Sequence, residues 1–126
     1  MNERITLDYG SGGRKTAELI ESILLPAFDN PALSLLGDGA VLEGSNRLVF
    51  STDSFVVSPW KFPGGDIGKL SVCGTVNDLC MAGGTPRYLS LSFILEEGFL
   101  FSDLRQIVSS IAEEAGKAGV TIVTGD

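Results

Sequence analysis

Four aspartates stand at positions where an ordinary surface carboxylate is hard to explain, and each has small neighbours. They are Asp38 in LGDGA, Asp53 in FSTDSF, Asp78 in TVNDLC and Asp126 in VTGD. Carboxylate oxygens suit Mg²⁺, which keeps several waters and bridges a few protein carboxylates to substrate phosphates. The sequence contains no histidine, which excludes Ser-His-Asp and Cys-His catalysis and the usual zinc sites. The residue types therefore indicate a magnesium and nucleotide site.

Asp78 is the strongest of the four candidates, because a helix is predicted over residues 66–82. Small side chains share one face of that helix with it by their spacing of three and four: Ser71, Gly74, Thr75 and Ala82. Such a face permits close approach of another segment, and an unpaired charge beside a core favours a cation or a strong hydrogen-bond partner. The neighbouring stripe, with Leu70, Cys73 and Cys80, is predicted to face the core, so both cysteines are expected to be reduced and buried.

The other three aspartates occupy turns or the ends of apolar runs. Asp53 and Asp126 each end a run that favours a strand, a position where sheets commonly present ligand groups. Gly37 and Gly39 flank Asp38 and allow a close backbone approach. A turn or an Asx-type cap explains each of these three residues about equally well.

A glycine-rich loop near the start of the chain, YGSGGRKT at residues 9–16, is a second candidate. It is similar to a phosphate-binding loop that opens a helix. The spacing G-x-x-x-x-G-K-[ST] is not met, however, and the preceding MNERITLD is not an apolar strand. From its residues alone, a mobile terminus before a helix is the stronger interpretation.

The elements that must position these residues follow from periodicity and breakers. Helices are predicted over residues 17–25, 66–82 and 102–118, and strands over 47–53, 88–95 and 120–124. Pro26 is expected to close the first helix, and Asp66 is expected to cap the second. The third helix buries five residues at spacings of three and four: Leu104, Ile107, Val108, Ile111 and Ala115. This order predicts a mixed α/β domain with its helices on one face of a sheet.

Composition narrows the class of protein further. The 126 residues are enough for one domain, and 44% hydrophobic residues are enough for a core. A net charge of −7, with nine scattered basic residues, argues against nucleic acid as a partner. We expect no membrane span, no signal peptide and a cytoplasmic location. The sequence stops directly after a strand at Asp126, so we expect a longer parent chain or a completing partner.

Three runs are specific enough to indicate a family: FPGGDIGKL at residues 62–70, GTVNDL at 74–79 and LSFILEEG at 91–98. With them, the whole chain closely resembles the HypE family of hydrogenase maturation proteins, within the superfamily of aminoimidazole ribonucleotide synthetase. The resemblance implies an N-terminal domain that uses ATP and Mg²⁺. It also implies a four-stranded mixed sheet that pairs with a second protomer into a barrel-like homodimer.

The resemblance also implies roles for individual residues. By motif, the magnesium ligands are the four aspartates named above: Asp38, Asp53, Asp78 and Asp126. Asp78 and Asn77 become the catalytic residues, and Asn77, Asp38 and Asp53 also contact the nucleotide. The glycine loop, Gly10, Ser11, Gly12 and Gly13, becomes a lid over the phosphates that we expect to be disordered without nucleotide. Tyr9 stands where the family commonly has His, which weakens any role for that side chain.

The activity implied for the family is the ATP-dependent dehydration of a carbamoyl group on a C-terminal cysteine, which gives a thiocyanate. HypF-like carbamoyltransferases and HypC- or HypD-like scaffold proteins are the implied partners. The family's C-terminal domain and its terminal cysteine are absent from these 126 residues, so we expect this chain alone to be inactive. An alternative is a non-catalytic dimerisation and docking module that binds partners through the apolar loop at residues 57–62.

Overall fold

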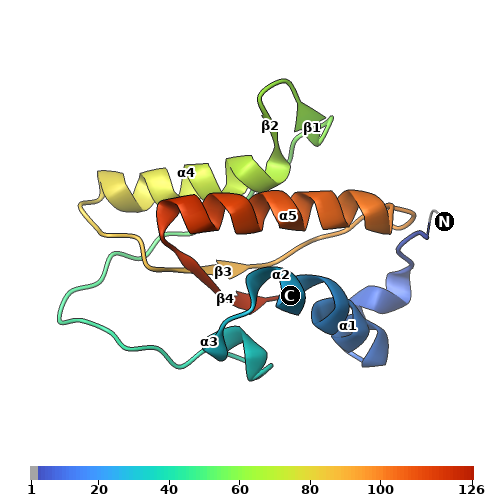
Figure 1. Cartoon of the computed structure of the whole chain (residues 1–126), viewed down its shortest axis with the longest axis horizontal. Coiled ribbons are helices and arrows are strands. Elements are labelled where there is room, and N and C mark those ends of the chain that lie inside the picture. The colour runs from blue at the N-terminus through green and yellow to red at the C-terminus, as the bar shows by residue number, and fades with distance from the viewer. Residues whose placement is uncertain (1–2) are drawn as a thin grey trace.

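The computed structural model describes residues 3–126, with two long helices beside a small pair of strands (Figure 1). In chain order the elements are a 3₁₀ turn Leu7–Gly10, α1 Arg14–Leu19, a π-helical turn Ile20–Leu24, α2 Leu25–Phe28, α3 Pro31–Ser34, β1 Lys61–Phe62, β2 Gly65–Asp66, α4 Ile67–Met81, β3 Tyr88–Leu91, α5 Phe101–Ala118 and β4 Thr121–Gly125. No helix within residues 3–126 combines the length and the apolar character needed to cross a membrane.

The first helix runs further than predicted, because α1, the π turn and α2 follow one another without a break from Arg14 to Phe28. Pro26 does not end it. In the π turn the amide of Leu25 donates to the carbonyl of Ile20, which widens the helix just before the proline. This shift in hydrogen-bond register accommodates the missing N–H of Pro26, so the helix continues for another half turn.

Helix α5 forms the centre of the core as the sequence predicts. All five residues of its predicted stripe are buried, and the Leu104 side chain is 0% exposed. One group of buried residues joins α5 to α4, β3 and β4, and a second joins it to Ile5 and the first helix. The helix ends at Gly119, whose φ of 70° is left-handed and favours glycine.

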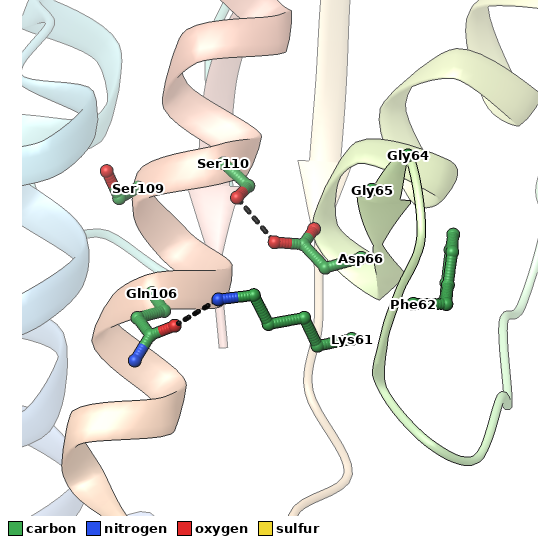
Figure 2. A pocket seen from close by; sticks show the side chains of 8 residues that line it. All are labelled: Lys61, Phe62, Gly64, Gly65, Asp66, Gln106, Ser109 and Ser110. Atoms are coloured by element: carbon green, nitrogen blue, oxygen red, sulfur yellow. Dashed lines mark hydrogen bonds between the residues drawn. The ribbon is translucent and has the colours of Figure 1, made fainter.

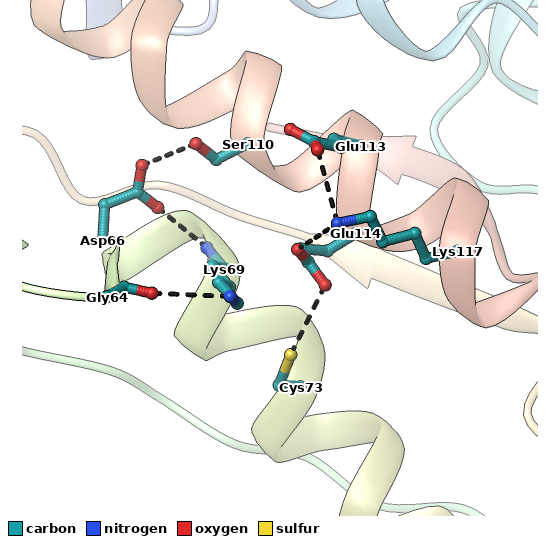
Figure 3. A network of polar contacts seen from close by, with 8 residues as sticks. All are labelled: Gly64, Asp66, Lys69, Cys73, Ser110, Glu113, Glu114 and Lys117. Atoms are coloured by element: carbon teal, nitrogen blue, oxygen red, sulfur yellow. Dashed lines mark hydrogen bonds and ion pairs between the residues drawn. The ribbon is translucent and has the colours of Figure 1, made fainter.

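Asp66 caps α4, which confirms the predicted role of this residue. The amide of Lys69 donates to Asp66 Oδ1 at 2.9 Å, and Ser110 Oγ of α5 donates to Asp66 Oδ2 at 2.5 Å (Figure 3). The carboxylate is therefore satisfied, although the residue is only 8% exposed. It joins the start of α4 to the middle of α5.

The buried face of α4 differs from the prediction. Gly68, Val72 and Leu79 are its buried residues, whereas Cys73 and Cys80 are both exposed free thiols. Gly68 lies so close to the backbone of α5 that it fixes which side of α4 faces inward. The cysteine stripe is thereby turned away from the core, and the Cys73 thiol lies 3.7 Å from a carboxylate oxygen of Glu114 (Figure 3).

The strands form two separate pairs instead of the predicted single four-stranded sheet. β3 and β4 are parallel, with a shift in register between Leu89 and Ser90, and β1 and β2 form a short antiparallel hairpin. The strand predicted over 120–124 is confirmed, and that over 88–95 is confirmed for its first half. The strand predicted over 47–53 does not form, because no backbone–backbone hydrogen bond joins it to another segment among residues 3–126.

Candidate functional site: a pair of carboxylates on helix α4

The fold brings together two of the four predicted ligands, Asp53 and Asp78. Asp78 lies in the last turns of α4, and Asp53 lies on the irregular stretch that passes this helix. A side-chain hydrogen bond with Asp78 raises the pKa of Asp53 above its usual value of 3.8, and partial loss of solvent and the charge of Asp78 act in the same direction. The exposed carboxylates of Asp53 and Asp78 thus lie side by side.

This pair suits a divalent cation. Two carboxylates in contact repel each other when both are ionised, and a cation between them removes that repulsion while using hard oxygen ligands. Within residues 3–126, no three His, Cys, Asp or Glu side chains gather closely enough to hold a metal ion. A pair of carboxylates fits the sparse protein coordination of Mg²⁺, which takes its remaining ligands from water and phosphate. The assignment of Asp38 and Asp126 as further ligands stays a prediction.

We expect Mg²⁺ to lower the pKa of Asp53. The raised pKa means that this carboxyl stabilises the fold at low pH and that the contribution is lost as the pH rises from 3.8 through the folded pKa. A bound cation favours the ionised form and reverses the shift. A ¹³C NMR titration of the Asp53 carboxyl with and without Mg²⁺ measures this, with K⁺ at equal ionic strength as the control. The same pKa in both salts would contradict cation binding at the pair.

Asp126 is held by its backbone at the end of β4. Its amide donates to the carbonyl of Leu91 at 3.0 Å, and its carbonyl accepts from the amide of Phe93 at 2.7 Å. These bonds extend the β3–β4 pairing by two residues, so the carboxylate stands at the carboxyl end of a parallel pair. Asp38 lies in an exposed bend after α3. Asn77 is exposed on α4, next to Asp78.

The glycine loop is exposed and is shaped by its own hydrogen bonds. The amide of Gly12 donates to Thr16 Oγ1 at 2.9 Å, and this hydroxyl donates to the carbonyl of Tyr9 at 2.6 Å. Ser11 Oγ donates to the carbonyl of Asp8 at 2.8 Å. Gly12 has a φ of 80°, a conformation that other residues rarely adopt. The lid function and the expected disorder without nucleotide stay predictions.

Tyr9 has a structural role that the sequence reading missed. Its ring packs edge-to-face against Phe101, with 5.1 Å between ring centroids, and the Lys15 ammonium lies 4.8 Å from the Tyr9 centroid. Phe101 is the first residue of α5. The aromatic pair therefore attaches the glycine loop to the core, and an aromatic residue just before a glycine-rich loop was the available signal.

A hollow of about 510 Å³ lies between the β1–β2 hairpin and α5, and its lining contains none of the predicted site residues (Figure 2). Lys61 reaches across it, with its Nζ 3.4 Å from Gln106 Oε1. Its one buried carboxylate, Asp66, is already satisfied by the cap of α4 and by Ser110. We therefore assign this hollow to the junction between helix and hairpin and not to the carboxylate site.

The sequence model for the AIR synthase related protein, N-terminal domain, matches residues 36–126, a range that includes all four predicted aspartates. The chain belongs to this family. The glycine loop lies before the matched range. The resemblance to the HypE family that the motifs indicated is also confirmed, by relatives along nearly the whole chain.

Among these relatives, the carbamoyl dehydratase HypE of Rhodobacter capsulatus is 51% identical over 128 residues, covering 99% of this chain but 38% of that protein. A crystal structure of the hydrogenase maturation protein HypE in complex with ATP has a TM-score of 0.93 and 55% identity, covering 96% of this chain and 36% of that one. A HypE–HypF complex has a TM-score of 0.60 and 51% identity, covering 86% and 35%. The chain thus spans less than two fifths of these relatives.

Proposed function

We propose that this chain binds Mg-ATP as the N-terminal part of a HypE-type carbamoyl dehydratase in hydrogenase maturation. The observation that carries the proposal is the interaction between the side chains of Asp53 and Asp78, which brings two hard oxygen ligands together beside the last turn of α4. The similarity to a HypE structure in complex with ATP supports the choice of nucleotide. Asp38 and Asp126 would complete the acidic set around the phosphates.

In this proposal the side chains hold and orient the nucleotide. Asp53 and Asp78 bind the cation, and Asn77 beside them offers an amide to a phosphate oxygen or to the reacting group. When bound, Mg²⁺ neutralises the charge that develops on the transferring phosphoryl group. The exposed glycine loop closes over the phosphates with its backbone amides.

In the complete enzyme, ATP would drive the dehydration of a cysteine thiocarboxamide to a thiocyanate. Phosphoryl transfer to the carboxamide oxygen turns that oxygen into a good leaving group, and loss of phosphate and protons from the same unit leaves the carbon–nitrogen triple bond. Cys73 and Cys80 lie within α4 and cannot act as a mobile acceptor. We therefore propose that the 126 residues alone bind nucleotide without turning it over.

Calorimetric titration with ATP tests the nucleotide proposal. With Mg²⁺ present we expect saturable heat at one site per chain, because the carboxylate pair needs the cation to accept phosphate oxygens. With EDTA in place of Mg²⁺ the heat should disappear. Equal binding in both buffers would show a nucleotide site that does not use the carboxylates, and absence of heat in both would refute the proposal.

We further propose that the chain forms a homodimer through residues 41–57. This stretch has strand-forming residues that pair with no other segment in the described part of the chain. It exposes Val41, Leu48, Phe50 and Val56, with Phe50 96% and Val56 99% exposed. Apolar side chains in this number on one unpaired segment are typical of an interface. A HypF-like carbamoyltransferase is a proposed further partner, because a HypE–HypF complex is among the similar structures. HypC- or HypD-like scaffold proteins are proposed from the resemblance alone.

Replacing Phe50 with Lys should shift the native mass from dimer to monomer, because a charge would be buried in the proposed interface. Native mass spectrometry at micromolar concentration measures the mass. Leu7→Lys is the matched control, since Leu7 is an exposed leucine in the 3₁₀ turn Leu7–Gly10, outside this segment. A wild-type monomer, or a Phe50→Lys dimer, would contradict the proposed interface.

The alternative docking module receives less support from the structure. Trp60, the largest side chain of the loop at residues 57–62, is half-buried and packs against the core that joins α4 and α5. The amide of Ile67 donates to the carbonyl of Trp60 at 2.8 Å, which fixes the loop to the start of α4. The aromatic residue is thus used within the chain, so we do not assign a partner to this loop.

A further inference from the structure

The stretch that carries Asp53 is attached to α4 by side chains and not by its backbone. Among residues 3–126, residues 48–57 make no backbone–backbone hydrogen bond. Two of its side chains, Val49 and Phe55, nevertheless reach glycines at the end of α4 and within it. These contacts hold the stretch, with Asp53 between them, beside the helix.

Phe55 provides the first of these contacts, at a glycine one helical turn before Asp78. A Cβ atom at Gly74 would lie 2.8 Å from Cζ and 3.0 Å from Cε1 of the Phe55 ring, well inside the usual separation of about 3.5–4.0 Å between carbon atoms. The ring therefore occupies the space that any side chain at position 74 would need. The predicted small face of α4, with its close approach of another segment, is confirmed at this point.

Val49 provides a second contact at the other end of the stretch. A Cβ atom at Gly84 would lie 2.9 Å from Cγ2 and 3.0 Å from Cβ of Val49. Gly84 is itself fixed at the end of α4, because its amide donates to the carbonyl of Leu79 at 2.9 Å. Gly74 and Gly84 lie on either side of Asp78 in sequence. Val49 and Phe55 likewise lie on either side of Asp53.

We infer that the packing of Phe55 against Gly74 positions the Asp53 carboxylate beside α4. The packing of Val49 against Gly84 holds the other end of the stretch, and we call these two contacts together the clamp. Phe55 does not contact the nucleotide or the cation in this scheme, so it is a positioning residue. The inference rests on the proposed function, since the site that the clamp serves is the proposed cation site.

A substitution and its compensation test the clamp. Gly74→Ala places a methyl group where the tip of the Phe55 ring lies, so the ring must shift, and we expect Asp53 to move with it. The double variant Gly74→Ala with Phe55→Leu removes the overlapping ring atoms and restores room for the stretch. Gly116→Ala is the matched control, because a Cβ placed at this exposed glycine of α5 has no non-neighbouring atom of residues 3–126 within 4 Å.

Two readouts keep failure of the clamp apart from failure of the proposed function. Calorimetry with Mg²⁺ should show at least tenfold weaker binding for Gly74→Ala, with the double variant within threefold of wild type and Gly116→Ala unchanged. Without any metal, a ¹³C NMR titration should show the pKa of Asp53 falling towards 3.8 in Gly74→Ala and rising again in the double variant. A loss of binding that the double variant does not rescue would overturn the clamp.

Mg²⁺ affinity and the pKa of Asp53 together distinguish a wrong clamp from a wrong cation site. If Gly74→Ala changes neither Mg²⁺ affinity nor the pKa of Asp53, the clamp is wrong even when the wild type binds Mg²⁺. If the wild type binds neither Mg²⁺ nor Mg-ATP, yet the pKa of Asp53 responds to Gly74→Ala and recovers in the double variant, the clamp holds and the proposed function fails. A nuclear Overhauser contact between the Phe55 ring and the Gly74 α protons should be present in the wild type, and its absence would also overturn the inference.

Discussion

Replacing Asp78 with Asn should weaken Mg-ATP binding at least tenfold while leaving the fold intact. Asn keeps the shape of the side chain but removes the negative charge, and an amide oxygen is a poorer ligand for Mg²⁺ than a carboxylate. The same change removes the negative charge of Asp78, one of the causes of the raised pKa of Asp53. Calorimetric titration with Mg-ATP measures the affinity, and circular dichroism checks that the helices remain.

Glu113→Gln is the matched control for Asp78→Asn. Glu113 is an exposed acid on α5 whose carboxylate lies 3.3 Å from the Lys117 ammonium, and exposed ion pairs of this kind contribute little to stability. Both variants raise the net charge by one, so a general electrostatic effect on an anionic nucleotide would be the same in the two. Equal affinity of Asp78→Asn and wild type would remove Asp78 from the site.

The parts of the fold that were predictable from the sequence are those determined by contacts close in the chain. The period of apolar residues fixed the buried face of α5, and the N-cap chemistry of Asp66 fixed the start of α4. Both are local signals, in which spacing along one helix or a single side chain determines the outcome. The prediction that Pro26 closes the first helix was wrong, because the π turn just before it accommodates the missing N–H of the proline.

The parts that were not predictable depend on approach between distant segments. The close approach of Gly68 to α5 determines which face of α4 is buried. The spacing of apolar side chains does not predict this approach, because glycine has no side chain. The stretch 47–53 has the composition of a strand, but a strand also needs a partner, which residues 3–126 do not supply. Asp53 and Asp78 could be named as candidates, but their contact depends on Phe55 meeting Gly74, a long-range event.

The second large effect is expected at Gly68. Replacing a helical glycine with alanine ordinarily stabilises a helix by about 1 kcal/mol. At Gly68 we expect alanine to destabilise the protein instead. The added Cβ would lie 2.5 Å from the Ile107 carbonyl oxygen and 3.2 Å from Cγ1 of Ile111. The nearer atom belongs to the backbone of α5 and cannot rotate away, so the two helices must separate. We expect a net loss of about 2 kcal/mol in the free energy of unfolding, within the usual range for overpacked cores.

Urea unfolding followed by the fluorescence of Trp60, which packs against the same core, measures this loss. Gly116→Ala on α5 should instead raise the free energy of unfolding. Its new methyl group meets no non-neighbouring atom of residues 3–126 within 4 Å, so only the gain in helix propensity remains. The two glycine-to-alanine variants should therefore differ by about 3 kcal/mol, the sum of a loss of about 2 and a gain of about 1. If both raised the stability, helices α4 and α5 would not be in contact through Gly68, and the inward face of α4 would have to be assigned anew.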